Sequence, residues 1–106
     1  IDYQRAAETG LSNQGWKDSF DSIFHADGRF PEGPVALVEV QGYAFAAFQA
    51  LADLSNALGQ ADAAGWVDRA EAMREAVESR FWQDDLGYYA VAVDGRGAPC
   101  RAIGSK

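Results

Sequence analysis

Residues 13–22 hold the side chains best suited to chemistry. Trp16 offers an aromatic face on which a sugar ring can stack, and Gln14 offers an amide to sugar hydroxyls. Asp18 follows two residues later, and desolvation beside an indole can keep a carboxyl group neutral and able to donate a proton. These residue types would suit a site in which Asp18 is a general acid and Trp16 and Gln14 contact a sugar. Taken alone, they favour the alternative in which Trp16 anchors the loop and Asp18 is a turn or N-cap residue.

Glu39 and Gln41 are further candidates, because they stand at the beginning of an otherwise apolar segment. A lone buried carboxylate is costly unless it is paired or lies in a polar site. We therefore expect Glu39 to face a substrate pocket and Gln41 to bind substrate hydroxyls. The alternatives stay open: Glu39 would pair with Lys17 or Arg29, and the glutamines would satisfy backbone groups of the loop.

Two helices are expected to position these candidates. Segment 36–58 is apolar around almost its whole circumference and ends before Gly59, which predicts a helix inside a larger protein. Segment 62–81 begins with the potential N-cap Asp62 and has a one-sided apolar stripe, which predicts an outer, solvent-facing helix. The connection between the two segments is very short, so they are expected to form an antiparallel helical hairpin.

The other segments are predicted to form turns and short strands. Residues 2–9 have the composition of the last turns of a helix that Gly10 would end. The Asp–Gly pair at residues 27–28 predicts a β-hairpin turn, and a second hairpin is predicted from strand 88–93 and turn 94–97. The fold class is therefore predicted to be all-α, with two small β-hairpin loops.

Composition and charge exclude several classes of protein. The chain has 106 residues, 48% of them hydrophobic and 12% aromatic, which allows one small domain and argues against intrinsic disorder. A formal net charge of −7 repels phosphates and anionic lipid, so we expect neither a nucleic-acid nor a membrane partner. A single cysteine, Cys100, and a single histidine, His25, exclude a disulfide framework and a zinc site rich in these ligands. We expect no metal and a cytoplasmic location.

Three sequence blocks resemble a known family of enzymes. They are NQGWKDS at residues 13–19, GPVALVEVQGY at residues 33–43 and FWQDDLGYY at residues 81–89. Together they resemble the amylo-α-1,6-glucosidases, glycogen-debranching-type glycoside hydrolases whose catalytic domain is an (α/α)6 barrel. The resemblance covers nearly the whole chain but only part of such a barrel. The chain is therefore expected to be a fragment of an (α/α)6 toroid, with residues 1–106 forming part of its catalytic domain.

This resemblance implies roles for the candidate residues. Asp18 corresponds to the acid that protonates the glycosidic oxygen, and Glu39 corresponds to a residue that contacts substrate or orients the acid. Enzymes of this kind invert configuration, with a second carboxylate that activates water. The resemblance places that base farther along the chain than these residues. The implied activity is hydrolysis of α-glucosidic bonds in glycogen-like glucans, and it requires no cofactor.

Two other classes of function stay open. A barrel-like module could bind carbohydrate without catalysing a reaction, or the apolar helix could pair with a copy of itself in a structural module. The expected partners are therefore an α-glucan or oligosaccharide substrate, together with the rest of the barrel or a second copy of the chain.

Overall fold

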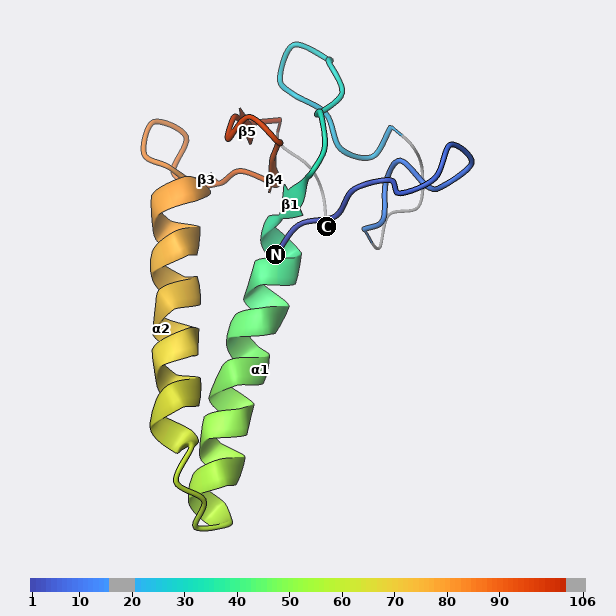
Figure 1. Cartoon of the computed structure of the whole chain (residues 1–106). Helices are drawn as coiled ribbons and strands as arrows, with labels where there is room; N and C mark the ends of the chain where they lie inside the picture. The colour runs from blue at the N-terminus through green and yellow to red at the C-terminus, as the bar shows by residue number, and fades with distance from the viewer. Residues whose placement is uncertain (16–20, 103–106) are drawn as a thin grey trace.

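The computed structural model describes residues 1–15 and 21–102, and two long antiparallel helices dominate it (Figure 1). Helix α1 spans Val38–Ala57, and helix α2 spans Ala63–Arg80. Between them, Gly59 has a φ of 67°, the left-handed conformation that commonly ends a helix. The predicted helical hairpin is confirmed, and each helix is one or two residues shorter at its ends than expected.

Helix α2 packs its apolar stripe against α1. The stripe residues are all buried or partly buried: Trp66, Ala70, Met73, Val77 and Phe81. Trp66 stacks on Phe48 of α1 with ring centroids 6.2 Å apart, and the guanidinium of Arg69 lies 4.8 Å from the centre of the indole. The predicted one-sided pattern is therefore confirmed by the packing. Neither helix of the described chain is long and apolar enough to cross a membrane.

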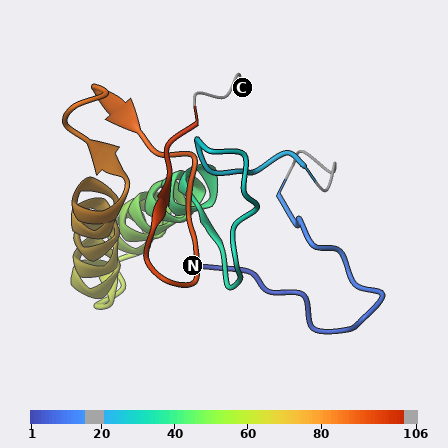
Figure 2. The ribbon, with the colours of Figure 1, turned by 90° about the horizontal axis from the view of Figure 1, so that it is seen from above.

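A three-stranded antiparallel sheet lies at the N-terminal end of α1 (Figures 1 and 2). Its strands, in spatial order, are β1 (Ala36–Leu37), β4 (Ala92–Val93) and β5 (Pro99–Cys100). A separate two-stranded ribbon pairs β2 (Trp82–Gln83) with β3 (Tyr88–Tyr89). The predicted turn at residues 94–97 is confirmed between β4 and β5, whereas the predicted strand 88–93 is divided between the two sheets.

The main buried cluster lies in the three-stranded sheet and the loops beside it. Its members come from four separate parts of the chain: Ile23, Val35 with Leu37, Ala92 and Cys100. In contrast, Tyr43 and Leu54 of helix α1 and the C-cap residue Leu58 are exposed by 67%, 55% and 62%. Within the described residues, the apolar circumference of α1 is therefore covered on only part of its surface.

The N-terminal segment 2–9 is not a helix, contrary to prediction. Tyr3 instead forms an antiparallel bridge to Val35, with both backbone hydrogen bonds at 2.8 Å. Its side chain packs against the buried cluster, so a long-range contact outweighs the local helical preference. Gly10 therefore closes a turn and does not end a helix. Its N–H donates to the carbonyl oxygen of Ala7 at 2.9 Å.

The predicted Asp27–Gly28 turn forms, but strands do not flank it. The His25 N–H donates to the carbonyl oxygen of Arg29 at 2.8 Å, and Gly28 has a φ of 87°. The neighbouring side chains are held by other contacts, since His25 reaches Asp94 and Arg29 pairs with Asp27. A single hydrogen-bonded turn therefore replaces the predicted hairpin.

Replacing Leu37 tests whether the sheet cluster holds the fold. Leu37 is only 3% exposed, so Leu37→Ala is expected to lower the free energy of unfolding by about 2–5 kcal/mol through lost burial and a residual cavity. Leu58→Ala is the matched control because that side chain is 62% exposed, and a change below about 0.5 kcal/mol is expected. Urea unfolding followed by tryptophan fluorescence measures both values. Equal values for the two variants would contradict this assignment of the core.

Candidate functional site

Trp16 and Asp18, the predicted stacking platform and general acid, lie outside the described residues. Their roles therefore stay predictions. Gly15 is the last described residue before them, and its surroundings show where the chain enters this segment.

A buried hydrogen-bond network holds the backbone at Gly15. The Oδ1 atom of Asn13, a residue only 6% exposed, accepts hydrogen bonds from the Tyr3 hydroxyl at 3.1 Å and the Gly15 N–H at 3.0 Å. Burial raises the pKa of Tyr3, so its hydroxyl stays protonated and remains a donor. A Cβ atom at Gly15 would lie 2.6 Å from Cδ1 of the buried Leu37, so a larger residue would require Leu37 to move.

Glu39 lies in the first turn of α1, directly beside Gly15. Its Oε1 atom would be 3.6 Å from a Cβ atom at Gly15. The side chain is half-buried, and its negative charge is favoured by the N-terminal end of the helix. The alternative partner Arg29 pairs elsewhere, and Glu39 forms no ion pair with any described residue. The fold thus brings Glu39 next to the residue that precedes Trp16.

The two predicted glutamines are hydrogen bonded to the backbone. Gln41 is 3% exposed, and its Nε2 donates to the carbonyl oxygens of Ile1 and Leu37 at 2.6 and 2.9 Å. Gln14 is exposed, and its Nε2 donates to two nearby carbonyl oxygens at 3.3 and 3.4 Å. These contacts match the alternative in which the glutamines satisfy backbone groups. Their binding to sugar hydroxyls stays a prediction.

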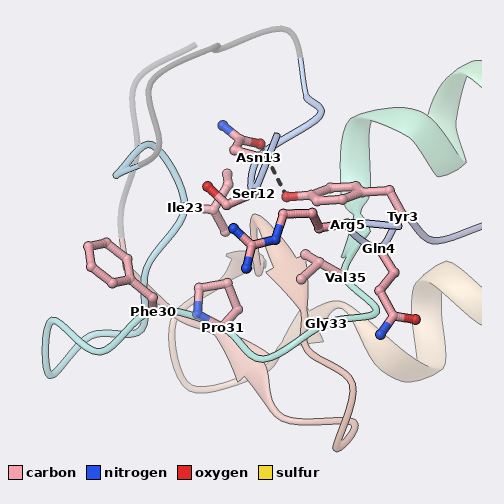
Figure 3. Close-up of a pocket in the computed structure, with 10 residues that line it drawn as sticks. All are labelled: Tyr3, Gln4, Arg5, Ser12, Asn13, Ile23, Phe30, Pro31, Gly33 and Val35. Carbon is pink, nitrogen blue, oxygen red and sulfur yellow. Dashed lines mark hydrogen bonds between the residues drawn. The ribbon is translucent and has the colours of Figure 1, made fainter. Parts of the chain in front are cut away.

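A pocket of about 400 Å³ opens beside this network (Figure 3). Its lining includes the polar, cationic and aromatic side chains of Tyr3, Arg5, Ser12, Asn13 and Phe30, together with Pro31. Figure 3 shows the Arg5 side chain reaching into the pocket toward Ser12 and Pro31. Arg5 forms no ion pair with the described part of the chain, so its guanidinium can bind an anionic group. The sequence analysis missed Arg5, because it lies in a segment mistaken for a helix.

A hydrogen bond between His25 and Asp94 connects the loop at residues 25–32, which lies beside the pocket, to the end of β4. Asp94 Oδ2 lies 3.0 Å from His25 Nε2, and the two side chains are only 7% and 13% exposed. Asp94 Oδ1 accepts the backbone N–H groups of Arg96 and Ala98, both at 2.9 Å. Burial alone would raise the pKa of Asp94, but these hydrogen bonds outweigh it and lower the pKa below its usual value.

The same turn also holds the far end of this loop. The Gly95 N–H donates to the carbonyl oxygen of Glu32 at 2.7 Å, and Arg96 pairs with the Glu32 carboxylate at 2.8 Å. Phe30 and Pro31 lie between the two attachment points and line the pocket. The turn after β4 thereby determines where this wall of the pocket stands.

Cys100 is a structural residue, although it lies near a histidine and an aspartate. It is fully buried, and burial raises the pKa of its thiol to about 11, so the reactive thiolate is scarce at neutral pH. Its Sγ lies 3.9 Å from His25 Nε2, the ring atom that also contacts Asp94. A nucleophile–histidine–acid relay uses opposite ring nitrogens, so these three residues do not form one. The described residues contain no group of three or more acidic, histidine or cysteine side chains placed to hold a metal ion.

Comparison with known families shows that the chain is a glycoside hydrolase domain. Residues 3–105 match the mannosylglycerate hydrolase MGH1-like glycoside hydrolase domain, and the chain belongs to this family. A search of curated proteins finds no significant match. The family match confirms the glycoside hydrolase class that the motifs predicted, without singling out the amylo-α-1,6-glucosidases. The helical hairpin and small sheets are compatible with part of a helical barrel.

Asp94 supplies a test of how the pocket wall is held. Asp94→Asn is expected to lower the free energy of unfolding by about 1–3 kcal/mol at pH 7, because His25 loses its charged partner. The pKa of Asp94 in the folded protein is below the ordinary value of 3.8. The contribution of Asp94 to the free energy of unfolding is therefore fully present above pH 3.8 and is lost as the pH falls through the pKa of the folded protein. Urea unfolding from pH 7 to pH 3 should show the two proteins converging at the acidic end. A difference that stays constant over this range would argue against the charged pair.

Proposed function

We propose that this chain supplies the acid side of a glycosidase site that hydrolyses α-glucosidic bonds in glycogen-like glucans. Family membership supports the reaction class. The observation that carries the assignment of the site is the position of Glu39. Its carboxylate stands beside Gly15, which directly precedes Trp16 and is three residues before Asp18. A cytoplasmic setting belongs to the proposal and suits a chain whose single cysteine is free.

In the proposed reaction, Asp18 donates its proton to the glycosidic oxygen as the bond to the anomeric carbon breaks. Water attacks that carbon from the opposite face and loses a proton to a carboxylate base, so the configuration inverts. The base belongs to another part of the barrel and would stand about 6.5–9.5 Å from Asp18 to leave room for the water. Neither proton transfer nor attack by water needs a cofactor.

The other candidates bind and position the substrate in this proposal. Trp16 stacks on a glucose ring, while Gln14 and Gln41 exchange their backbone contacts for sugar hydroxyls. Glu39 accepts a hydrogen bond from a sugar hydroxyl or orients the segment that carries Asp18. Its place at the N-terminal end of α1 supports this role, because the positive end of the helix dipole attracts negative charge.

A small anionic glycoside is a second candidate substrate, and Arg5 favours it. The family's description names mannosylglycerate hydrolase, whose substrate in that name carries a carboxylate. A guanidinium recognises a carboxylate through two parallel hydrogen bonds, and Arg5 reaches into the pocket beside Ser12 and Asn13. An uncharged glucan would make no use of that positive charge.

Removing the proton donor tests the main proposal. In the intact enzyme, Asp18→Asn is expected to lower kcat on α-glucan by about a hundredfold to ten-thousandfold, the usual contribution of general acid catalysis. Hydrolysis of α-glucosyl fluoride should fall far less, because fluoride leaves with little help from a proton.

Asp21→Asn is the matched control, since Asp21 is an exposed carboxylate three residues farther along the same loop. Its kcat on both substrates should stay within about threefold of the unmodified enzyme, as expected for a surface substitution. Retained glucan hydrolysis by Asp18→Asn, or equal losses on both substrates, would show that Asp18 is not the acid.

Replacing Arg5 distinguishes the two candidate substrates. If the enzyme acts on an anionic glycoside, Arg5→Gln should lower kcat/KM for mannosylglycerate by about 10- to 100-fold, the value of a hydrogen bond to a charged group. The value for an uncharged methyl mannoside should not change. Arg29→Gln is the control, because Arg29 is exposed and already paired with Asp27. If Arg5→Gln and the unmodified enzyme had the same kcat/KM for mannosylglycerate, the anionic substrate would be excluded.

A further inference from the structure

The β2–β3 hairpin carries an exposed aromatic pair away from the sites described above. Figure 2 shows this hairpin projecting from the end of α2, clear of the three-stranded sheet. Trp82 and Tyr89 are directly opposed across its two strands, with ring centroids 4.9 Å apart and an interplanar angle of 68°. They remain 38% and 39% exposed, so the pair presents ring surface to solvent. We call these two residues the aromatic patch.

Carboxylates hold both rings of the aromatic patch in place. Trp82 Nε1 donates to Asp84 Oδ1 at 2.7 Å, and the Tyr89 hydroxyl donates to Glu78 Oε1 at 2.6 Å. The hydrogen bond to Glu78 raises the pKa of Tyr89, so the hydroxyl keeps its proton. Rings that are already oriented lose little rotational freedom when a ligand binds to them.

The charges around the aromatic patch restrict what can bind there. Asp84 and Glu78 are exposed carboxylates that can each accept further hydrogen bonds, and the neighbouring Asp85 is paired with Arg101. Acidic groups repel anionic ligands, and the net charge of −7 adds to this repulsion. Exposed aromatic faces flanked by hydrogen-bond acceptors fit an uncharged ligand that has both C–H faces and hydroxyl donors. A neutral sugar chain has this chemistry.

We propose that the aromatic patch is a second carbohydrate-binding site, which holds a neutral glucan chain outside the catalytic site. The choice of glucan as the ligand rests on the proposed function. The antiparallel arrangement of the helices supports a binding site at this position. Strand β2 follows the C-terminal end of α2, and Glu39 is in the first turn of α1. These two ends lie at the same end of the helical hairpin (Figure 1). One polymeric chain therefore contacts both the aromatic patch and the catalytic site, whereas a monosaccharide glycoside is too short to do so.

Electrophoresis of the intact protein through gels containing glycogen measures this binding. Trp82→Ala is expected to weaken retardation by glycogen about tenfold or more, as truncating an aromatic anchor does at other binding surfaces. Val67→Ala is the control, since Val67 is a 53% exposed apolar residue on α2, the predicted outer helix, and its retardation should equal that of the unmodified protein. Unchanged retardation of Trp82→Ala, or an equal loss in Val67→Ala, would overturn the proposal.

A second pair of variants keeps both rings and changes only the acceptors. Glu78→Gln and Asp84→Asn replace each carboxylate with an amide of nearly the same shape, and together they should weaken retardation by about two- to tenfold. Thermal unfolding of every variant identifies any that fail to fold, and the amide variants then decide the result. Retardation equal to that of the unmodified protein in the folded amide variants would overturn the role of the carboxylates and with it the proposed site.

Activity measurements separate this inference from the proposed function. Trp82→Ala should hydrolyse α-glucosyl fluoride at the unmodified rate but lose activity on dilute glycogen, because only the long substrate reaches the aromatic patch. An unmodified enzyme that hydrolyses α-glucan but is not retarded by glycogen would overturn the second site alone. A protein retarded through Trp82 that hydrolyses no α-glucan would support the second site and overturn the proposed function.

Discussion

The burial of Leu37 is the contact on which the arrangement of the candidate site depends. Its backbone pairs with Ala92 in the sheet, and its side chain lies in the main buried cluster, 3% exposed. Helix α1 begins at the next residue, so the same residue determines where the helix starts relative to the sheet. Leu37 also leaves no room for a side chain at Gly15 and thereby brings the backbone before Trp16 close to Glu39. A short strand and one buried leucine thus set the position of Gly15, the last described residue before the predicted acid segment.

Polar contacts between distant residues then shape the pocket around this junction. Asp94 binds His25, and the turn that follows holds Glu32, so the end of β4 is attached to the loop at two points. The contact between His25 and Asp94 involves side chains with little access to water, where an unpaired polar group is costly. On the opposite wall, Arg5 has no ion-pair partner among the described residues. Among the residues that the structure describes, the pocket therefore combines a wall attached at two points with the cationic side chain of Arg5.

The sequence by itself determined the elements that depend on local patterns. Apolar periodicity and Gly59 predicted both helices and their antiparallel connection, because neighbouring residues alone decide which face of a helix is apolar. The Asp–Gly turn at residues 94–95 predicted the β4–β5 hairpin for the same reason. The blocks at residues 13–19, 33–43 and 81–89 together carried the resemblance that predicted a glycoside hydrolase, the class that the family match confirms. A resemblance of this kind depends on residue types and their spacing, which the sequence shows without coordinates.

Only the tertiary structure decided how distant segments meet. Residues 2–9 look helical in isolation, but the pairing of Tyr3 with Val35 draws them into an extended conformation. The contact between His25 and Asp94 joins residues 69 positions apart, and no local pattern marks one as the partner of the other. Arg5 lines the pocket because the N-terminal segment packs beside it, which local sequence patterns do not show. Sequence patterns report the preference of each segment, whereas burial and long-range hydrogen bonding determine which preferences are realised.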